Sequence, residues 1–161
     1  ARLTFICTHK SRRSHLCQIW AQAAAAYYGI PVETFSGGTA ATAFNPRAVA
    51  TLKRAGFGIS DPAADSNPRY LVKFHPDSAA MECFSKVYDE PPNPRDDFCA
   101  VMVCSQADKS CPTVAGASLR IAVPYDDPKV ADDTASEAVQ YDERCAQIAR
   151  EMLFVFSRVE R

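Results

Sequence analysis

The sequence lacks long apolar runs and has no marked excess of charge of either sign. No stretch approaches the roughly 20 apolar residues that a membrane-spanning helix requires. The 18 basic and 19 acidic residues nearly balance, so the chain has no overall field that favours nucleic acid or an anionic membrane. We therefore expect neither partner, and any positively charged site must be local.

The features of a secreted disulfide protein are also missing. The chain opens on residues 1–6, Ala-Arg-Leu-Thr-Phe-Ile, without the charged segment and cleavable apolar stretch of a signal peptide. Its seven cysteines are an odd number, and 161 residues that are 47% hydrophobic can form one core without disulfide bonds. We expect a single cytoplasmic domain over residues 1–161, in which some of the thiols are reactive.

The apolar residues recur with the periods of alternating strands and helices. Helical spacing predicts one helix that carries Leu16 and Tyr27, one that starts at Pro46, and a long one that begins near Thr134. Alternation of this kind favours parallel strands joined by right-handed crossovers. We therefore predict an α/β fold, a single open doubly wound four-stranded parallel sheet with helices on both faces. The strands are expected at residues 3–7, 32–35, 98–104 and 119–123.

Residues 61–97 interrupt this alternation. The segment is rich in Pro, Asp and Asn, which favour turns and loops. Residues 70–74 and 81–87 nevertheless have the composition of two short strands that can pair. We interpret the segment as an insertion within the domain that forms a hairpin or flap.

A Cys-X5-Arg-Ser sequence follows the first predicted strand and precedes the first predicted helix. Open α/β sheets bind ligands at the carboxyl ends of their strands. The backbone N–H groups of such a loop can converge on the oxygens of an anion, and the helix N-terminus adds a favourable dipole. We therefore predict a site for a tetrahedral oxyanion. The loop comprises Cys7, Thr8, His9, Lys10, Ser11, Arg12 and Arg13.

Two residues of this motif have predicted chemical roles, and a third has two alternatives. The planar guanidinium of Arg13 can bind two anion oxygens together and stays charged. Positive surroundings favour a thiolate, so we predict that Cys7 is a nucleophile that attacks phosphorus or arsenic. Ser14 either donates a hydrogen bond to this thiolate or caps the helix.

The remaining basic residues of the loop have less specific roles. His9 and Lys10 either raise the positive potential of the anion site or are solvated. For Arg12 we favour a solvated loop residue. His15 and His75 have no assignable partner in the sequence, and we interpret them as structural or surface residues.

The fourth predicted strand is followed by residues 124–128, Pro-Tyr-Asp-Asp-Pro. These aspartates come at the carboxyl end of a strand, on the same rim of the sheet as Cys7. A proton donor at this position would assist departure of an alcohol, a phenol or water from the anion. We predict that Asp127 rather than Asp126 is this general acid. The alternative is an ordinary turn or helix cap.

Cys104 and Cys111 form a second cysteine pair, separated by six polar or small residues. A turn or an unwound helix could bring them within disulfide distance. Zinc is disfavoured because no Cys-X2-Cys or nearby histidine pair supplies further ligands, and we expect no metal site. The pair is therefore either redox-active or two buried inert thiols. Packing suffices to explain four other cysteines, Cys17, Cys83, Cys99 and Cys145.

These motifs together resemble low-molecular-weight protein tyrosine phosphatases, and more specifically the thioredoxin-coupled arsenate reductases built on that fold. The resemblance covers most of the chain. Its motifs are Phe5-Ile6-Cys7-Thr8 with Ser11 and Arg13-Ser14, Phe35-Ser36-Gly37-Gly38, Asn45-Pro46-Arg47-Ala48, Gly58-Ile59-Ser60, Cys104-Ser105-Gln106-Ala107-Asp108 with Cys111-Pro112, and Asp126-Asp127-Pro128.

The resemblance implies a three-cysteine reaction. Cys7 would attack arsenate, Arg13 would bind its oxygens, and Asp127 would assist loss of water. Cys104 would then attack Cys7 and release arsenite, and Cys111 would attack Cys104 to carry the disulfide outward. The family uses no tightly bound cofactor and takes electrons from reduced thioredoxin.

Two other functions remain open from the sequence. A phosphatase acting on phosphotyrosine or small phosphomonoesters would need only Cys7, Arg13 and Asp127. Lys129 and Val130 argue against a tyrosine phosphatase, because that family often has aromatic residues at these positions. A non-catalytic oxyanion sensor would bind phosphate through the loop without turning it over.

Overall fold

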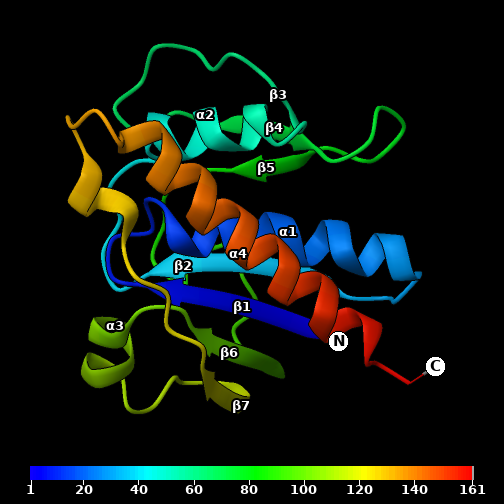
Figure 1. Cartoon of the computed structure of the whole chain (residues 1–161). Helices are drawn as coiled ribbons and strands as arrows, with labels where there is room; N and C mark the ends of the chain where they lie inside the picture. Colours follow the sequence, from blue (N-terminus) through cyan, green and yellow to red (C-terminus); the bar gives the residue numbers. More distant parts are fainter. Residues whose placement is uncertain (161) are drawn as a thin grey trace.

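Four parallel strands form the centre of the computed structural model, which describes residues 1–160 (Figure 1). Their order across the sheet is β2-β1-β6-β7. The register pairs Cys7 with Gly38 and Ile6 with Met102, so the carboxyl ends of the central strands meet at one edge. The predicted four-stranded parallel sheet is confirmed. Its strands are β1 (Arg2–Cys7), β2 (Glu33–Gly38), β6 (Phe98–Met102) and β7 (Ala117–Ala122).

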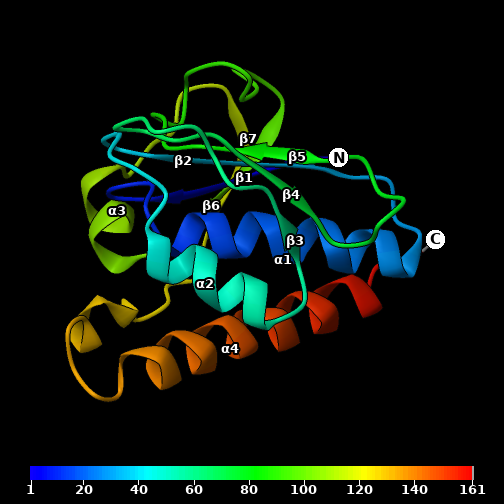
Figure 2. The same ribbon diagram turned by 90° about the horizontal axis from the view of Figure 1, so that it is seen from above.

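Two long helices, α1 (Arg13–Tyr28) and α4 (Glu137–Ser157), pack against each other over one face of this sheet (Figure 2). Both bury residues at three- and four-residue spacings, such as Leu16 and Ile19 in α1 and Ile148 and Met152 in α4. The long helix starts three residues after Thr134, because the chain first forms the short 3-10 helix η1 (Pro128–Ala131) and a turn.

The shorter helices have local causes in the sequence. α2 (Pro46–Arg54) packs against α4 and begins as predicted, because the Asn45 side chain accepts a hydrogen bond from Arg47 N (2.9 Å) and proline occupies the first helical position. α3 (Ser105–Ser110) stands after the end of β6. Its presence means that the third predicted strand, 98–104, ends two residues early, at Met102.

The second face of the sheet differs from the expected cover of helices on both faces. α1, α2 and α4 lie on one side (Figure 2), and the connection that enters β6, residues 88–97, forms no helix. This connection stays close to the sheet, since Asn93 Nδ2 donates to Ser36 O (3.0 Å). Its composition explains the absence of a helix, because Pro91 and Pro92 lack N–H groups and restrict the residues before them.

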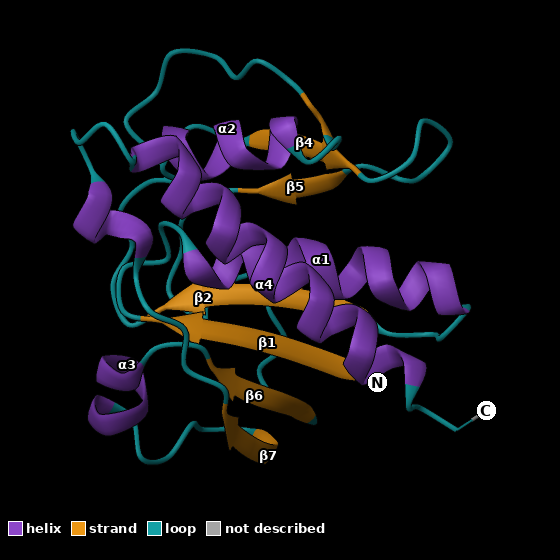
Figure 3. Cartoon of the chain, in the orientation of Figure 1, coloured by secondary structure: helices purple, strands orange, loops and turns teal. Residues whose placement is uncertain are grey.

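The predicted hairpin in the insertion is confirmed and has one additional strand (Figure 3). β4 (Tyr70–Lys73) pairs antiparallel with β5 (Met81–Cys83) and with the two-residue β3 (Gly58–Ile59). β5 is shorter than the predicted 81–87. After Cys83 the chain leaves the hairpin and joins β2, where Gly38 N donates to Lys86 O (3.0 Å) and Tyr88 N donates to Gly38 O (3.0 Å).

Within residues 1–160, no helix combines the length and the apolar character needed to cross a membrane.

Candidate active site

Backbone carbonyl groups of the loop between β1 and α1 face the segment that follows β2. The segment that follows β2 binds these carbonyls through its own backbone N–H groups. By contrast, within the described part of the chain, the N–H groups of residues 8–12 donate no hydrogen bond to protein atoms, so they remain available to an anion. The carbonyl bonds run from Thr39 N to Cys7 O (3.1 Å), from Ala40 N to Thr8 O (2.9 Å) and from Asn45 N to Ser11 O (2.9 Å).

Cys7 ends β1 and faces the start of α1. Its side chain is buried, and Sγ lies 3.1 Å from Ser14 Oγ. Ser14 is the second residue of α1 and does not cap the helix, because the N-cap position belongs to Arg12. Of the two alternatives for Ser14, the helix cap is therefore excluded, and the Ser14 hydroxyl lies in hydrogen-bond contact with Cys7, whose thiol is the donor.

Arg13 joins the loop to the predicted general acid. Its Nη2 lies 2.6 Å from Asp127 Oδ2, and its Nη1 donates to Tyr125 O (2.9 Å). Asp127 is held in turn by Lys129 N, which donates to its Oδ1 (3.1 Å). Asp126, by contrast, is almost fully exposed and lies 3.5 Å from Arg144. The structure therefore places Asp127, and not Asp126, beside the Arg13 guanidinium.

The interpretation of Arg12 as a solvated loop residue is wrong. Its side chain is only 12% exposed and pairs with Asp132 Oδ2 (2.9 Å). Its Nε also donates to the hydroxyl of Tyr141 (2.6 Å), which donates to Asp132 Oδ1 (2.7 Å). Asp132 follows η1 and Tyr141 belongs to α4, so Arg12 ties the loop to both elements. This role could not be predicted from the sequence, because the partners of Arg12 lie more than a hundred residues away in the chain.

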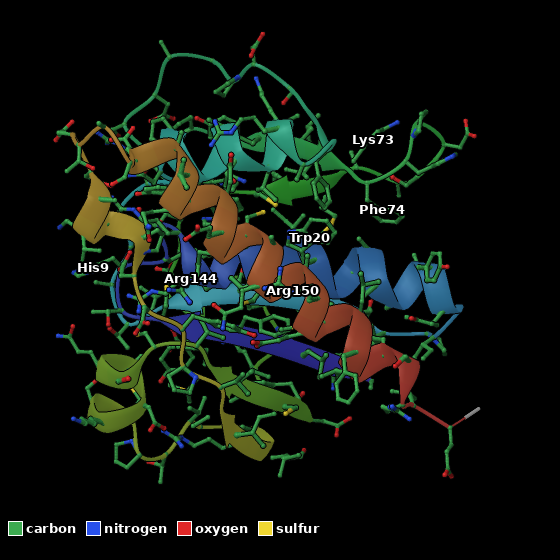
Figure 4. The ribbon with its side chains drawn as sticks, in the orientation of Figure 1. His9, Trp20, Lys73, Phe74, Arg144 and Arg150 are labelled. Carbon is green, nitrogen blue, oxygen red and sulfur yellow. The ribbon has the colours of Figure 1, made fainter. Side chains whose placement is uncertain are left out.

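His9 and Lys10 are adjacent, but their side chains point in opposite directions. His9 is exposed and lines the site cavity, at the end of the molecule where the yellow turn containing η1 lies (Figure 4). Lys10 is fully buried, and its Nζ lies 3.0 Å from His15 Nδ1. The Lys10 ammonium therefore does not line the anion site, and a solvated Lys10 is also wrong. Burial, and then the nearby Lys86, hold the pKa of Lys10 well below its ordinary value.

A cavity of about 360 Å³ lies over the loop. Four of its residues were not predicted as site residues. Asn45 was predicted to cap a helix, Asn45 and Gln106 belong to motifs of the family resemblance, and Lys129 was noted only for its lack of an aromatic ring. These four are Thr42, Asn45, Gln106 and Lys129, and they join Cys7, Thr8, His9, Ser11, Arg12, Arg13 and Asp127 around the cavity.

Cys104 lies at the same rim of the sheet as Cys7. Its Sγ is 3.4 Å from Oγ1 of Thr8, the residue that follows Cys7. Cys104 caps α3, since its Sγ accepts from Ala107 N (3.3 Å), and Cys111 is the residue directly after that helix. Seven helical steps of 1.5 Å correspond to about 10 Å, longer than the roughly 4.4 to 6.8 Å between Cα atoms in a disulfide. Both thiols are free in this conformation.

Arg120 on β7 holds the end of α3 that carries Cys111. Its Nη2 donates to Asp108 O (2.8 Å) and Asp108 Oδ1 (2.6 Å), and its Nε donates to Cys111 O (3.1 Å). Carbonyls at the end of a helix have no intrahelical partners, so these bonds stabilise the helical form of residues 105–110. Arg120 was not predicted from the sequence, since nothing local marks an arginine in a strand as a helix cap.

The other cysteines are largely packed in the interior. Cys17, Cys83 and Cys145 are buried, and Cys99 is half-buried. Burial raises the pKa of the Cys83 thiol to about 11 and that of Cys17 well above its ordinary value. Protonated buried thiols of this kind are poor nucleophiles. Among the described residues, no group of three or more His, Cys, Asp or Glu side chains is arranged to hold a metal ion.

Comparison with known proteins relates this chain to proteins of known function. No protein-family model matches the chain. An arsenate reductase of Brevibacillus brevis is 31% identical over 124 residues, which cover 77% of this chain and 74% of the relative. A solved arsenate reductase in its phosphate-binding state aligns with 99% of this chain and 98% of its own, with a TM-score of 0.65 and 13% identity. A low-molecular-weight phosphotyrosine phosphatase of Vibrio cholerae O395 aligns with 97% of this chain and 94% of its own, with a TM-score of 0.62 and 13% identity.

Proposed function

The chain belongs to the arsenate reductase family, enzymes with the low-molecular-weight phosphatase fold, and from this premise we propose that it reduces arsenate to arsenite through Cys7, Cys104 and Cys111. The observation that carries the proposal is the contact of Cys104 Sγ with Thr8 (3.4 Å). This contact places a second thiol beside the oxyanion loop that carries Cys7. A phosphatase reaction has no use for a thiol at that position.

In the first step the N–H groups of the loop and the Arg13 guanidinium bind arsenate oxygens. Once deprotonated, Cys7 Sγ accepts a hydrogen bond from the Ser14 hydroxyl beside it (3.1 Å), attacks arsenic and forms an S–As bond. A hydroxyl group of the arsenate takes a proton and leaves as water, and the As–O bond breaks. Asp127 is the proposed donor of that proton, because its carboxyl group lines the same cavity as Cys7 and lies beside the Arg13 guanidinium (2.6 Å).

In the next steps the electrons come from thiols. The Cys104 thiolate attacks Cys7 Sγ, an S–S bond forms, and the S–As bond breaks with its electron pair left on arsenic, which departs as arsenite. Cys111 then attacks Cys104 Sγ and releases Cys7 as a thiolate. The product is a disulfide between Cys104 and Cys111, which an external dithiol such as reduced thioredoxin reduces to restore the enzyme.

The test is arsenate-dependent NADPH oxidation in the presence of thioredoxin and thioredoxin reductase. We expect Cys7→Ser, Cys104→Ser and Cys111→Ser each to lower turnover by at least about a thousandfold, because each removes a thiol that no other group replaces. Cys99→Ser is the matched control, since Cys99 is half-buried in β6 and has no place in the relay. Absence of arsenate turnover in the wild type would contradict the proposal.

A parallel assay with p-nitrophenyl phosphate separates this reaction from simple phosphatase activity. A phosphatase requires Cys7 and Arg13 but is indifferent to Cys104 and Cys111. Fast hydrolysis of this ester, together with unchanged activity of Cys104→Ser, would favour a phosphatase. The exposed Val130 and Lys129 next to Asp127 offer no aromatic wall for a phenol ring, so we expect arsenate to be the better substrate.

A further inference from the structure

Behind the oxyanion loop lies a buried polar cluster that the proposed reaction does not use. Lys10 Nζ lies 3.0 Å from His15 Nδ1 and donates to Ser36 Oγ. Ser36 Oγ bonds in turn to Gln18 Oε1. His15 and Gln18 belong to α1, and Ser36 belongs to β2. The Lys10 side chain therefore links the loop to the two elements beside it.

The stability of the fold alone does not account for a lysine at this place. Lys10 is fully buried, and within residues 1–160 it forms no salt bridge. Removing an amine from water without a carboxylate partner is costly, and an apolar side chain of similar volume usually serves as well or better. Local features that oppose stability concentrate at functional sites.

The backbone of Lys10 has an unusual conformation. Its φ of 43° lies in the left-handed region, which residues other than glycine and asparagine rarely adopt. The residue also lies so close to β2 that a Cβ added at Gly38 would stand 2.7 Å from Lys10 N. Left-handed residues in tight loops are one way by which successive N–H groups come to face a common anion.

We propose that Lys10 is a positioning residue of the oxyanion site, anchored by its side chain to His15 and Ser36 so that the left-handed turn aims the N–H groups of the loop at the substrate. Lys10 acts from behind the loop and does not touch the anion. This inference rests on the proposed function, since it assumes that the loop binds arsenate.

The test compares two buried lysines. Lys10→Met keeps a linear side chain and removes the bonds of Nζ. We expect it to weaken the binding of inorganic phosphate and of arsenate, measured by calorimetry, by about tenfold or more, which corresponds to the loss of at least one buried hydrogen bond. The midpoint of thermal unfolding shows whether the variant remains folded, because His15 Nδ1 and Ser36 Oγ lose a buried partner.

Lys86→Met is the matched control. Lys86 is also buried, with 4% exposure, but its ammonium lies over the Phe84 ring (4.5 Å) and forms no hydrogen bond with the loop. We expect its affinity for phosphate to remain within about twofold of the wild type. Ser36→Ala gives a second test should Lys10→Met fold poorly. It removes one anchor of Lys10 and should weaken phosphate binding while Lys10 itself is retained.

The possible results separate the two proposals. Weaker binding in Lys10→Met and Ser36→Ala, with Lys86→Met unchanged, supports a positioning role. Wild-type affinity in Lys10→Met, or in a folded Ser36→Ala when Lys10→Met does not fold, would overturn the inference and leave the proposed function intact. An equal loss of affinity in Lys86→Met would overturn it as well, because the effect would then be general to buried lysines. Failure of the wild type to bind either anion would overturn both proposals.

Discussion

Adjacent residues of the oxyanion loop have different partners and therefore different tasks. Arg13 pairs with Asp127 in the wall of the cavity, whereas Arg12 pairs with Asp132 and Tyr141 and fixes the loop to α4. Lys10 turns inward although its neighbour His9 faces the cavity. At this scale the partner of a side chain, rather than its chemical type, decides its role.

The buried thiol of Cys83 gives a prediction about alkaline stability. Its pKa rises from the ordinary value of 9.0 to about 11 in the folded protein, because burial disfavours the thiolate. Between these values the unfolded chain releases a proton that the folded chain retains. The contribution of Cys83 to stability is thus complete below about pH 9 and is lost as the pH rises through about 11, at up to about 1.4 kcal/mol per pH unit.

Urea denaturation of the wild type and of Cys83→Ala at several pH values measures this effect. We expect a constant difference in the free energy of unfolding between pH 6 and 8, where the thiol is protonated in both states. Above pH 9 the wild type should lose stability more steeply than the variant, although other buried cysteines contribute a common slope to both. If the free energies of unfolding of the two proteins ran parallel over the whole pH range, a buried, protonated Cys83 would be contradicted.

At the scale of elements, α3 is the part of the molecule that must change during the proposed reaction. It separates Cys104 from Cys111 by nearly two helical turns, and no disulfide between them can form until it unwinds. The helix has only six residues, and such short helices are marginal without tertiary support. Arg120 supplies that support from β7.

Arg120→Gln should therefore speed formation of the Cys104–Cys111 disulfide. In a Cys7→Ser background with glutathione disulfide as oxidant, we expect about tenfold faster oxidation, because unwinding no longer breaks the hydrogen bonds to Asp108 and Cys111. Acid quenching, alkylation and mass spectrometry follow the reaction. Arg54→Gln is the control, since Arg54 pairs with Asp142 on α4. Equal rates in all proteins would show that Arg120 does not restrain α3.

At the scale of the whole molecule, the regular part of the fold could be predicted from the sequence. The four strands and the long helices follow from periodic apolar residues, and the helix start at Pro46 follows from its cap. The non-helical connection 88–97 and the additional strand β3 (Gly58–Ile59) could not be predicted. Contacts with distant residues determine both, and such contacts leave no period in the sequence.

The candidate site likewise has features that could be predicted from the sequence and features that could not. The local motif was sufficient to place Cys7, Arg13 and the oxyanion loop at the carboxyl end of β1, and the position after β7 was sufficient to place Asp127 on the same rim, where the structure has their shared cavity. The chemical roles of these residues stay predictions. The inward turn of Lys10, the partners of Arg12 and the helix between the two late cysteines depend on packing between elements. The motif therefore indicates the chemistry, whereas only the assembled structure shows which side chains hold the loop in place.

A single turnover tests the central claim most directly. Fully reduced enzyme, freed of external thiols and mixed with arsenate, should release about one arsenite per chain and accumulate one disulfide, between Cys104 and Cys111, as mapped by peptide mass spectrometry. Cys111→Ser should release arsenite and stop at a Cys7–Cys104 disulfide. Absence of arsenite from the wild type, or undiminished release from Cys104→Ser, would contradict the three-cysteine mechanism.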